Sequence, residues 1–298
     1  MCHDLCHRSL VRVTVLTLAF IGMGQANTSV HAALFGVTNS DLVIIEPTNP
    51  SATPTIVGPH GLDSLPGFVR VNDLAFNPVS DRIFGIVYVG LSPFDTRLVE
   101  YDRGTGTGTV LASVNQITSL QYHNGLGTLI ASRQVSSGNS EQIVELSLDG
   151  THSVILDNNN DNDTIVYDSV QDILYAINGE NGALNKPDNL YAIDLDTSST
   201  QEIALVQLGS STAAFDENDN AFLGVEPGNN AEAPNRNNVY RATTTAGGAP
   251  VNVDLLGTIP GDTVYGIGFA PVPEPSTLIL AVLGLMSLGM TRRRRQRA

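Results

Sequence analysis

Cysteine is almost absent from this chain. The two cysteines, Cys2 and Cys6, both lie within the first ten residues, so the remaining sequence has none. Disulfide bonds and thiol chemistry are therefore excluded from the body of the protein. Its stability must come from a packed core, and about 240 residues between the two ends are enough to build one.

Basic side chains are also scarce between the two ends. Residues 33–271 contain eight Lys and Arg against 28 Asp and Glu, a formal net charge of −20. An acidic surface of this kind repels phosphate backbones, which excludes nucleic acid as a partner. It favours solubility outside the cell and suits loosely held cations.

The N-terminal segment predicts export. Arg8 and Arg12 form a short basic region, and the uncharged, largely apolar run Val13–Met23 follows it. Eleven residues are too few for a membrane span, so we interpret residues 1–32 as a signal peptide and not a retained anchor. Small residues offer cleavage after Ala26 or after Ala32. The partners implied are the Sec translocon and signal peptidase.

The last 27 residues, 272–298, combine three features in order. A proline-rich motif comes first, an apolar run from Leu278 to Met290 follows, and a basic cluster ends the chain. The prolines interrupt the preceding strand and favour an extended, protease-accessible segment. The apolar run predicts transient anchoring in the inner membrane, with the basic end on the cytoplasmic side. The predicted processing and sorting residues are Pro273, Glu274, Pro275, Arg292, Arg293, Arg294 and Arg295.

This layout resembles the PEP-CTERM sorting signal of Gram-negative bacteria. The resemblance covers residues 272–298 only. It implies that an exosortase, a membrane-embedded cysteine transpeptidase, cuts near Pro273–Pro275. It also implies release to the cell surface or the exopolysaccharide matrix of a biofilm, and it identifies no ligand.

A repeat of about 45 residues runs through the middle of the chain. Each unit begins with an aromatic residue, and the second apolar strand follows eight positions later with Gly or Ala as its third residue. We expect this small residue to let neighbouring sheets approach closely. Third and fourth strands follow, separated by turn-forming Gly, Asn and Asp. The leading aromatics, spaced 46, 45 and 48 residues apart, are Phe76, Tyr122, Tyr167 and Phe215.

Four short strands in each repeat predict an all-β fold, a β-propeller spanning residues 33–271. The N-terminal unit, from Leu34, lacks a first strand, and Val264–Phe269 can supply it. The ring then has five blades of four strands, closed by pairing of the two ends, and Phe269 should be buried between blades. Closure would remove the exposed sheet edges. The alternative is an open β-sandwich or solenoid.

No catalytic motif is visible. None of His60, His123 and His152 has metal-ligand spacing to another, and no catalytic triad or Gly-x-Ser-x-Gly elbow can be drawn. The glycine-rich stretch Gly104–Gly108 lacks the lysine of a phosphate loop and precedes a strand, so it predicts a turn. We therefore predict no catalytic residues and no cofactor, although propeller enzymes assemble sites from single residues on several blades.

The segment Asp157–Asp163 is the one metal candidate. Asp157, Asp161 and Asp163 alternate with asparagines, and carboxylate and amide oxygens are calcium ligands. Asn162 stands where an EF-hand loop needs glycine, so the segment also fits a plain acidic turn between blades. Three further acidic stretches recur between the first and second strands and predict hairpin turns: Asn77–Asp81, Asp168–Asp172 and Asp216–Asn220.

One segment interrupts the repeat. Gly58–Phe68 is an insertion between blades, and irregular loops on a rigid scaffold often carry binding sites; a plain connector is the alternative.

The sequence leaves two hypotheses for function. The first is a non-catalytic surface or matrix protein that binds polysaccharide or other proteins. The second is an extracellular hydrolase or lyase acting on polysaccharide at the propeller channel. Carboxylates, histidines or a metal clustered at the channel would favour the enzyme.

Overall fold

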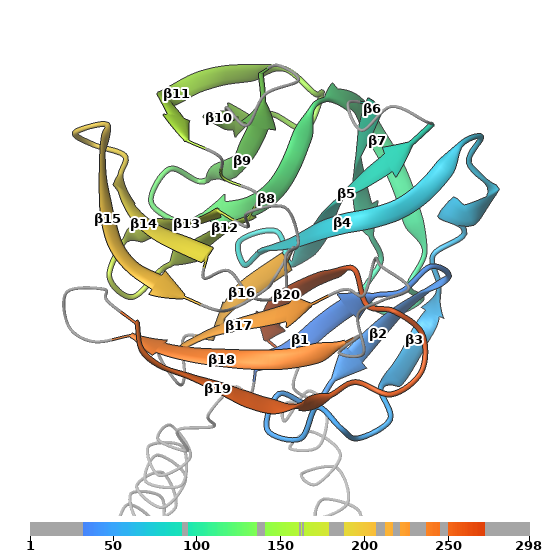
Figure 1. Ribbon diagram of the computed structural model, residues 1–298. Coiled ribbons are helices and arrows are strands. Elements are labelled where there is room, and N and C mark those ends of the chain that lie inside the picture. Colours follow the sequence, from blue (N-terminus) through green and yellow to red (C-terminus); the bar gives the residue numbers. More distant parts are fainter. Residues whose placement is uncertain are drawn as a thin grey trace, which may run out of the picture. The chain divides into compact units, whose positions relative to one another are not determined.

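The described part of the chain is an all-β ring. The computed structural model describes residues 32–90, 95–135, 141–160, 162, 164–178, 188–206, 212–216, 221–226, 237–244 and 250–271. Ala32–Val272 form one compact unit, built from five four-stranded antiparallel sheets arranged as blades (Figure 1). This is the predicted five-bladed β-propeller, and the rival sandwich and solenoid are wrong.

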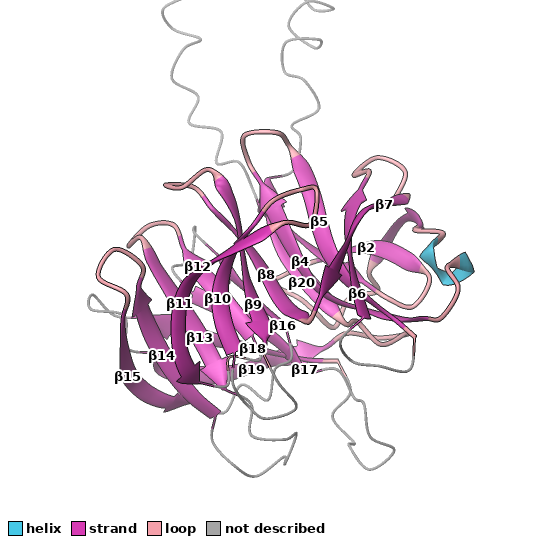
Figure 2. Cartoon of the chain, turned by 90° about the horizontal axis from the view of Figure 1, so that it is seen from above, coloured by secondary structure: helices cyan, strands magenta, loops and turns pink. Residues whose placement is uncertain are grey.

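Strands make up nearly all of the ordered structure (Figure 2), and the single helix among the described residues is the 3-10 turn η1 (Leu62–Ser64). In every blade the strands follow one another from the inner strand outward. Blade 1 contains β20 (Gly266–Pro271), β1 (Ala32–Val37), β2 (Asp41–Ile45) and β3 (Thr55–Pro59). Blade 2 contains β4 (Phe68–Asn77), β5 (Arg82–Val89), β6 (Asp95–Tyr101) and β7 (Gly108–Asn115). Blade 3 contains β8 (Ile117–His123), β9 (Thr128–Gln134), β10 (Glu141–Leu146) and β11 (His152–Asn160). Blade 4 contains β12 (Thr164–Asp168), β13 (Ile173–Asn178), β14 (Asp188–Asp194) and β15 (Ser199–Val206). Blade 5 contains β16 (Thr212–Asp216), β17 (Ala221–Glu226), β18 (Asn238–Thr244) and β19 (Pro250–Thr258).

The two ends of the domain pair to close the ring. β1 and β20 are antiparallel, with Ala32 opposite Pro271 and Val37 opposite Gly266. The closing strand starts at Gly266, two residues later than the expected Val264. The backbone N–H of Val264 donates to the side-chain oxygen of Asn237 at 2.9 Å and so takes no part in a ladder.

The core consists of five apolar clusters, each between two neighbouring blades. Alternate side chains of every strand face one neighbour, and the remaining side chains face the other. Phe269 differs from the expectation, because it is only partly buried and packs at the edge of the cluster between blades 5 and 1. The neighbouring Ile267 is fully buried in that cluster.

The small residues of the second strands make room for large side chains of their own blade. A Cβ added to Gly85 would lie 2.8 Å from a ring carbon of Tyr101, and one added to Gly36 would lie 2.7 Å from Cδ1 of Ile45. Tyr101 and Ile45 are almost completely buried. These glycines therefore serve packing within a blade more directly than the expected approach between sheets.

The recurrent acidic stretches form hairpin turns where the structure describes them. The side-chain oxygen of Asn77 accepts from the N–H groups of Val79 and Ser80, and Asp168 accepts in the same way from Val170 and Gln171. In the third stretch, residues 217–220 lie outside the described part of the chain. Gly104–Gly108 is the predicted turn between β6 and β7, where the Gly106 N–H donates to the Asp102 carbonyl at 2.8 Å.

The insertion Gly58–Phe68 packs against the next blade along the chain. The Gly108 N–H donates to the His60 carbonyl at 2.9 Å. A Cβ on Gly106 would lie 2.4 Å from the Gly58 carbonyl oxygen, so only glycine allows this approach. Leu62 of η1 is buried in the cluster between blades 1 and 2. These contacts are those of a connector that joins blade 1 to blade 2.

Candidate functional site

The five inner strands carry a ring of small polar residues around the propeller axis. Each ring position lies three residues before the leading aromatic of its repeat. The four side chains of this ring are fully buried, and the fifth position is a glycine. The set, which we call the axial ring, is Asp73, Ser119, Thr164, Thr212 and Gly266.

Asp73 joins three blades of this ring. Its Oδ2 accepts hydrogen bonds from Oγ of Ser119, at 2.5 Å, and from the N–H of Leu120, at 2.9 Å. Its Oδ1 accepts from Oγ1 of Thr212 and from the N–H of Leu74, both at 2.9 Å. All four bonds come from protein donors, so the acceptor capacity of the carboxylate is filled.

The hydroxyls of the axial ring continue this network. Ser119 also accepts from the N–H of Ile165 in the inner strand of blade 4, at 3.0 Å. Thr212 accepts from the N–H of Ile267 in the inner strand of blade 1, at 3.0 Å. Hydrogen bonds of this layer therefore reach all five inner strands.

Glycine at position 266 allows the network to close. A Cβ there would lie 3.1 Å from the Cα and the carbonyl carbon of Asp73. Without a side chain on β20, Asp73 of blade 2 reaches Thr212 of blade 5, although β20 belongs to the blade between them.

Burial dominates the electrostatics of Asp73. Desolvation raises the pKa of its carboxyl group to about 7, and the four hydrogen bonds oppose this rise. A buried carboxyl group with a raised pKa and specific hydrogen-bond partners is a feature of many catalytic acids. The lone pairs of Asp73 are occupied, however, and the next residue along every inner strand is apolar and fully buried: Leu74, Leu120, Ile165, Ala213 and Ile267.

A second buried polar cluster lies between blades 3 and 4. The carboxylate of Glu141, at the start of β10, is only 2% exposed. Its Oε2 accepts from Oγ of Ser132 at 2.5 Å and from the N–H of Asn162 at 3.0 Å. Ser132 lies two residues after Ile130, and Glu141 lies two residues before Ile143. Both isoleucines pack against blade 4, so Ser132 and Glu141 share that face of their sheet.

Two asparagines of this interface have buried amide atoms without a protein partner. Asn162 is fully buried, and neither its Oδ1 nor its Nδ2 makes a hydrogen bond. Oδ1 of Asn178, at the end of β13, is likewise buried and unbonded. Asn178 is two residues beyond Ala176, which packs in the cluster with Ile130, so its side chain faces blade 3.

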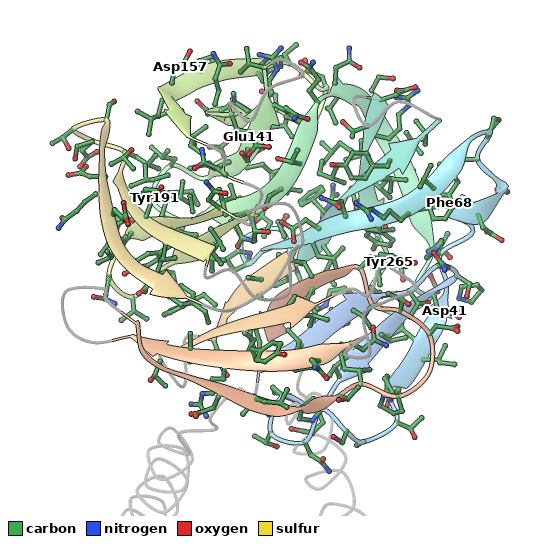
Figure 3. The ribbon with its side chains drawn as sticks, in the orientation of Figure 1. Asp41, Phe68, Glu141, Asp157, Tyr191 and Tyr265 are labelled. Atoms are coloured by element: carbon green, nitrogen blue, oxygen red, sulfur yellow. The ribbon has the colours of Figure 1, made fainter. Side chains whose placement is uncertain are left out.

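Asp157, the first predicted calcium ligand, lies on the other face of blade 3. Its Oδ2 accepts from Nε2 of Gln142 at 2.7 Å, and Gln142 alternates with Glu141 along β10. Asp157 is exposed, and Figure 3 shows it farther from the ring centre than Glu141. It belongs to β11 and not to the expected turn. Asp161 and Asp163 lie outside the described residues. No three His, Cys, Asp or Glu side chains come together in the described part of the chain.

The histidines serve local structure. Nδ1 of the buried His60 accepts from the N–H of Leu62 at 3.0 Å, and Nδ1 of His123 accepts from the N–H of Leu126 at 3.1 Å. Burial lowers the pKa of both imidazoles. His123 also stacks on Tyr167, with ring centroids 4.2 Å apart. His152 is exposed at the start of β11. The three lie on different strands or connections and form no common site.

Sequence reasoning missed both Asp73 and Glu141. Asp73 occupies a repeat position that is Ser or Thr in three other blades, so a comparison of that column would have found it. Glu141 carries no such signal, because its partner Asn162 lies 21 positions away, in the connection to the next blade.

The ring of five blades defines a β-propeller domain. The family of the PEP-CTERM protein-sorting motif matches residues 271–295. This motif marks the protein for export across the inner membrane to the cell surface or extracellular space, and it implies processing by an exosortase. The sorting residues Pro273–Pro275 and Arg292–Arg295 and the apolar run 278–290 lie outside the described residues. Within the described part, no helix has the length and hydrophobicity needed to cross a membrane.

One of three similar solved structures supports the fold. A chain from the crystal structure of a nidogen/laminin complex aligns over 80% of this chain and 98% of its own, with a TM-score of 0.51 and 10% identity. TolB from Acinetobacter baumannii aligns over 78% and 53%, with a TM-score of 0.45 and 14% identity. A gluconolactonase, XC5397 from Xanthomonas campestris, aligns over 66% of both chains, with a TM-score of 0.44 and 14% identity. The first shows the propeller fold alone, and the other two are too distant to support any conclusion. No curated protein matches the sequence.

Proposed function

We propose that this exported propeller is a non-catalytic surface or matrix protein that binds exopolysaccharide or other surface proteins. The exported location is given by the sorting motif. The acidic composition, net −20 over residues 33–271, suits a soluble extracellular domain.

The state of Asp73 supports a non-catalytic role most directly. A general acid or base must exchange a proton with a substrate within hydrogen-bond reach. Asp73 is fully buried, and its four hydrogen bonds all come from the protein. His60 and His123 likewise use Nδ1 to accept backbone N–H groups. These groups therefore stabilise the scaffold.

The test uses the processed protein recovered from the cell surface. It is mixed with exopolysaccharide purified from the same cells, and co-sedimentation measures binding. Reducing ends and unsaturated sugar products are followed over the same period. Binding without new ends supports the proposal. A hydrolase would release reducing ends and a lyase unsaturated sugars, and either product would replace this proposal with the polysaccharide-cleaving enzyme.

A further inference from the structure

The interface between blades 3 and 4 carries three polar residues with buried side-chain oxygens. Glu141 is the buried carboxylate, Asn162 lies at the passage from β11 to β12, and Asn178 ends β13. The Asn162 N–H touches the Glu141 carboxylate at 3.0 Å. The backbone of Asn162 is therefore in direct contact with that carboxylate.

The two asparagine oxygens lack partners although they are buried. Folded proteins pair about nine in ten or more of their buried polar groups, and each exception calls for an explanation, such as a bound water or ion. Here the orphaned acceptors are Oδ1 of Asn162 and Oδ1 of Asn178. Both belong to residues that lie at the same interface as Glu141.

The donor set is made of oxygen alone. Carboxylate and amide oxygens together are the ligands of hard cations, and calcium completes six to eight oxygen ligands with backbone carbonyls and water. Magnesium prefers near-ideal octahedra and retains several waters, so it suits amide carbonyls from two blades less well. A water bound to such a cation can accept from Nδ2 of Asn162, which has no protein acceptor.

We propose that Glu141, Asn162 and Asn178 form a calcium site that joins blade 3 to blade 4. This site differs from a calcium loop built on Asp157, because that carboxylate lies on the opposite face of blade 3. Its function is to tie two blades together through an ion supplied by the surroundings of an exported protein.

The experiment uses the processed protein, stripped of metal with chelator and titrated with calcium chloride by calorimetry. We expect one calcium per chain and a melting temperature higher by a few degrees in calcium than in chelator. Glu141→Gln and Asn178→Ala should each weaken calcium binding at least tenfold. Asp149→Asn is the matched control, since Asp149 is an exposed carboxylate of the same blade whose turn an asparagine can keep.

Asn178→Ala separates a metal role from a packing role. It removes an amide oxygen that has no protein partner, so its melting temperature in chelator should equal that of the wild type. Its calcium-dependent rise should nevertheless disappear. The proposal is overturned if the wild type binds no calcium, or if Asn178→Ala retains the full calcium response. It is also overturned if Asp149→Asn loses binding to the same extent as Glu141→Gln.

Discussion

Thr212 donates a hydrogen bond to Asp73 from blade 5 to blade 2, although blade 1 separates the two in the ring. The bond is 2.9 Å long, and both residues are fully buried. It places a carboxylate where a regular five-fold repeat would place another hydroxyl. Asp73 therefore compensates for the missing side chain at Gly266.

Asp73→Asn should destabilise the propeller. At pH 5 the carboxyl group carries one proton, which the rotatable hydroxyl of Ser119 or Thr212 can accept. An amide NH2 would instead place an N–H against the backbone N–H of Leu74 or Leu120. Leaving a buried donor unsatisfied costs about 1–3 kcal/mol. Chemical denaturation at pH 5 should show this loss in the free energy of unfolding. Asp149→Asn on the exposed turn serves as the control and should change it little.

The same variant tests the pH dependence. The pKa of Asp73 is raised from 3.8 to about 7 in the folded protein, so between these values the folded state binds more protons than the unfolded state. The contribution of this group is fully present below about pH 4 and is lost as the pH rises through about 7. The stability advantage of the wild type over Asp73→Asn should therefore shrink between pH 4.5 and pH 8. An advantage that grows with pH would mean that the four donors hold the carboxylate ionised.

Gly266→Ala should strain the axial ring. Its Cβ would approach backbone atoms of Asp73 at 3.1 Å, and backbone yields less readily than a flexible side chain. Overpacking of this kind costs about 1–3 kcal/mol. Thermal melting measures the effect. Gly261→Ala cannot serve as the control, because Gly261 has a φ of 95°, a backbone conformation that alanine rarely adopts. Gly104→Ala is better matched, with its nearest neighbour at 3.5 Å. Equal melting temperatures of the two variants would contradict the close packing of β20 on β4.

Removal of the closing strand should open the ring. Two chains that both start at Asn27 are compared, one ending at Pro271 and the other at Gly261. The first retains the pairing of β1 with β20, and the second exposes β1 as a sheet edge. Size-exclusion chromatography should find a monomer for the longer chain and aggregates for the shorter. A stable monomer of the shorter chain would refute closure as the basis of folding.

Processing should remove both ends. Ala32 is paired with Pro271 in the closing ladder, so cleavage after Ala26 preserves β1 whole and is the expected site. The intact mass of protein from the cell surface should fit a chain that starts at Asn27 and lacks Arg292–Arg295. A start at Ala33 would place the cut inside the strand. Recovery of the full-length chain would contradict processing altogether.

Most of the fold could be predicted from the repeat in the sequence. Phe76, Tyr122, Tyr167 and Phe215 each lie on an inner strand of the ring. Strand alternation makes such a pattern visible because it depends only on neighbouring residues. The start of β20 was misplaced because the N–H of Val264 bonds to the Asn237 side chain, a contact between distant residues that no local pattern encodes.

The polar sites were harder to find for the same reason. The role of Asp73 depends on Thr212, a residue 139 positions away. The role of Glu141 depends on the backbone N–H of Asn162, which lies 21 positions further along the chain. The acidic run 157–163 suggests a metal site by its composition. Its first carboxylate, Asp157, nevertheless lies on the opposite face of the sheet from Glu141.

The position of β20 also fixes the order in which the domain can be completed. β1 is the first strand of the domain to cross the membrane, and its partner β20 is the last, ending at Pro271, where the match to the sorting motif begins. Blades 2 to 5 can each form from contiguous chain as it emerges, but blade 1 must wait for the whole domain. Such long-range pairing is slow. Closure of the ring is therefore the last folding step of the domain, completed by the strand that directly precedes the sorting motif.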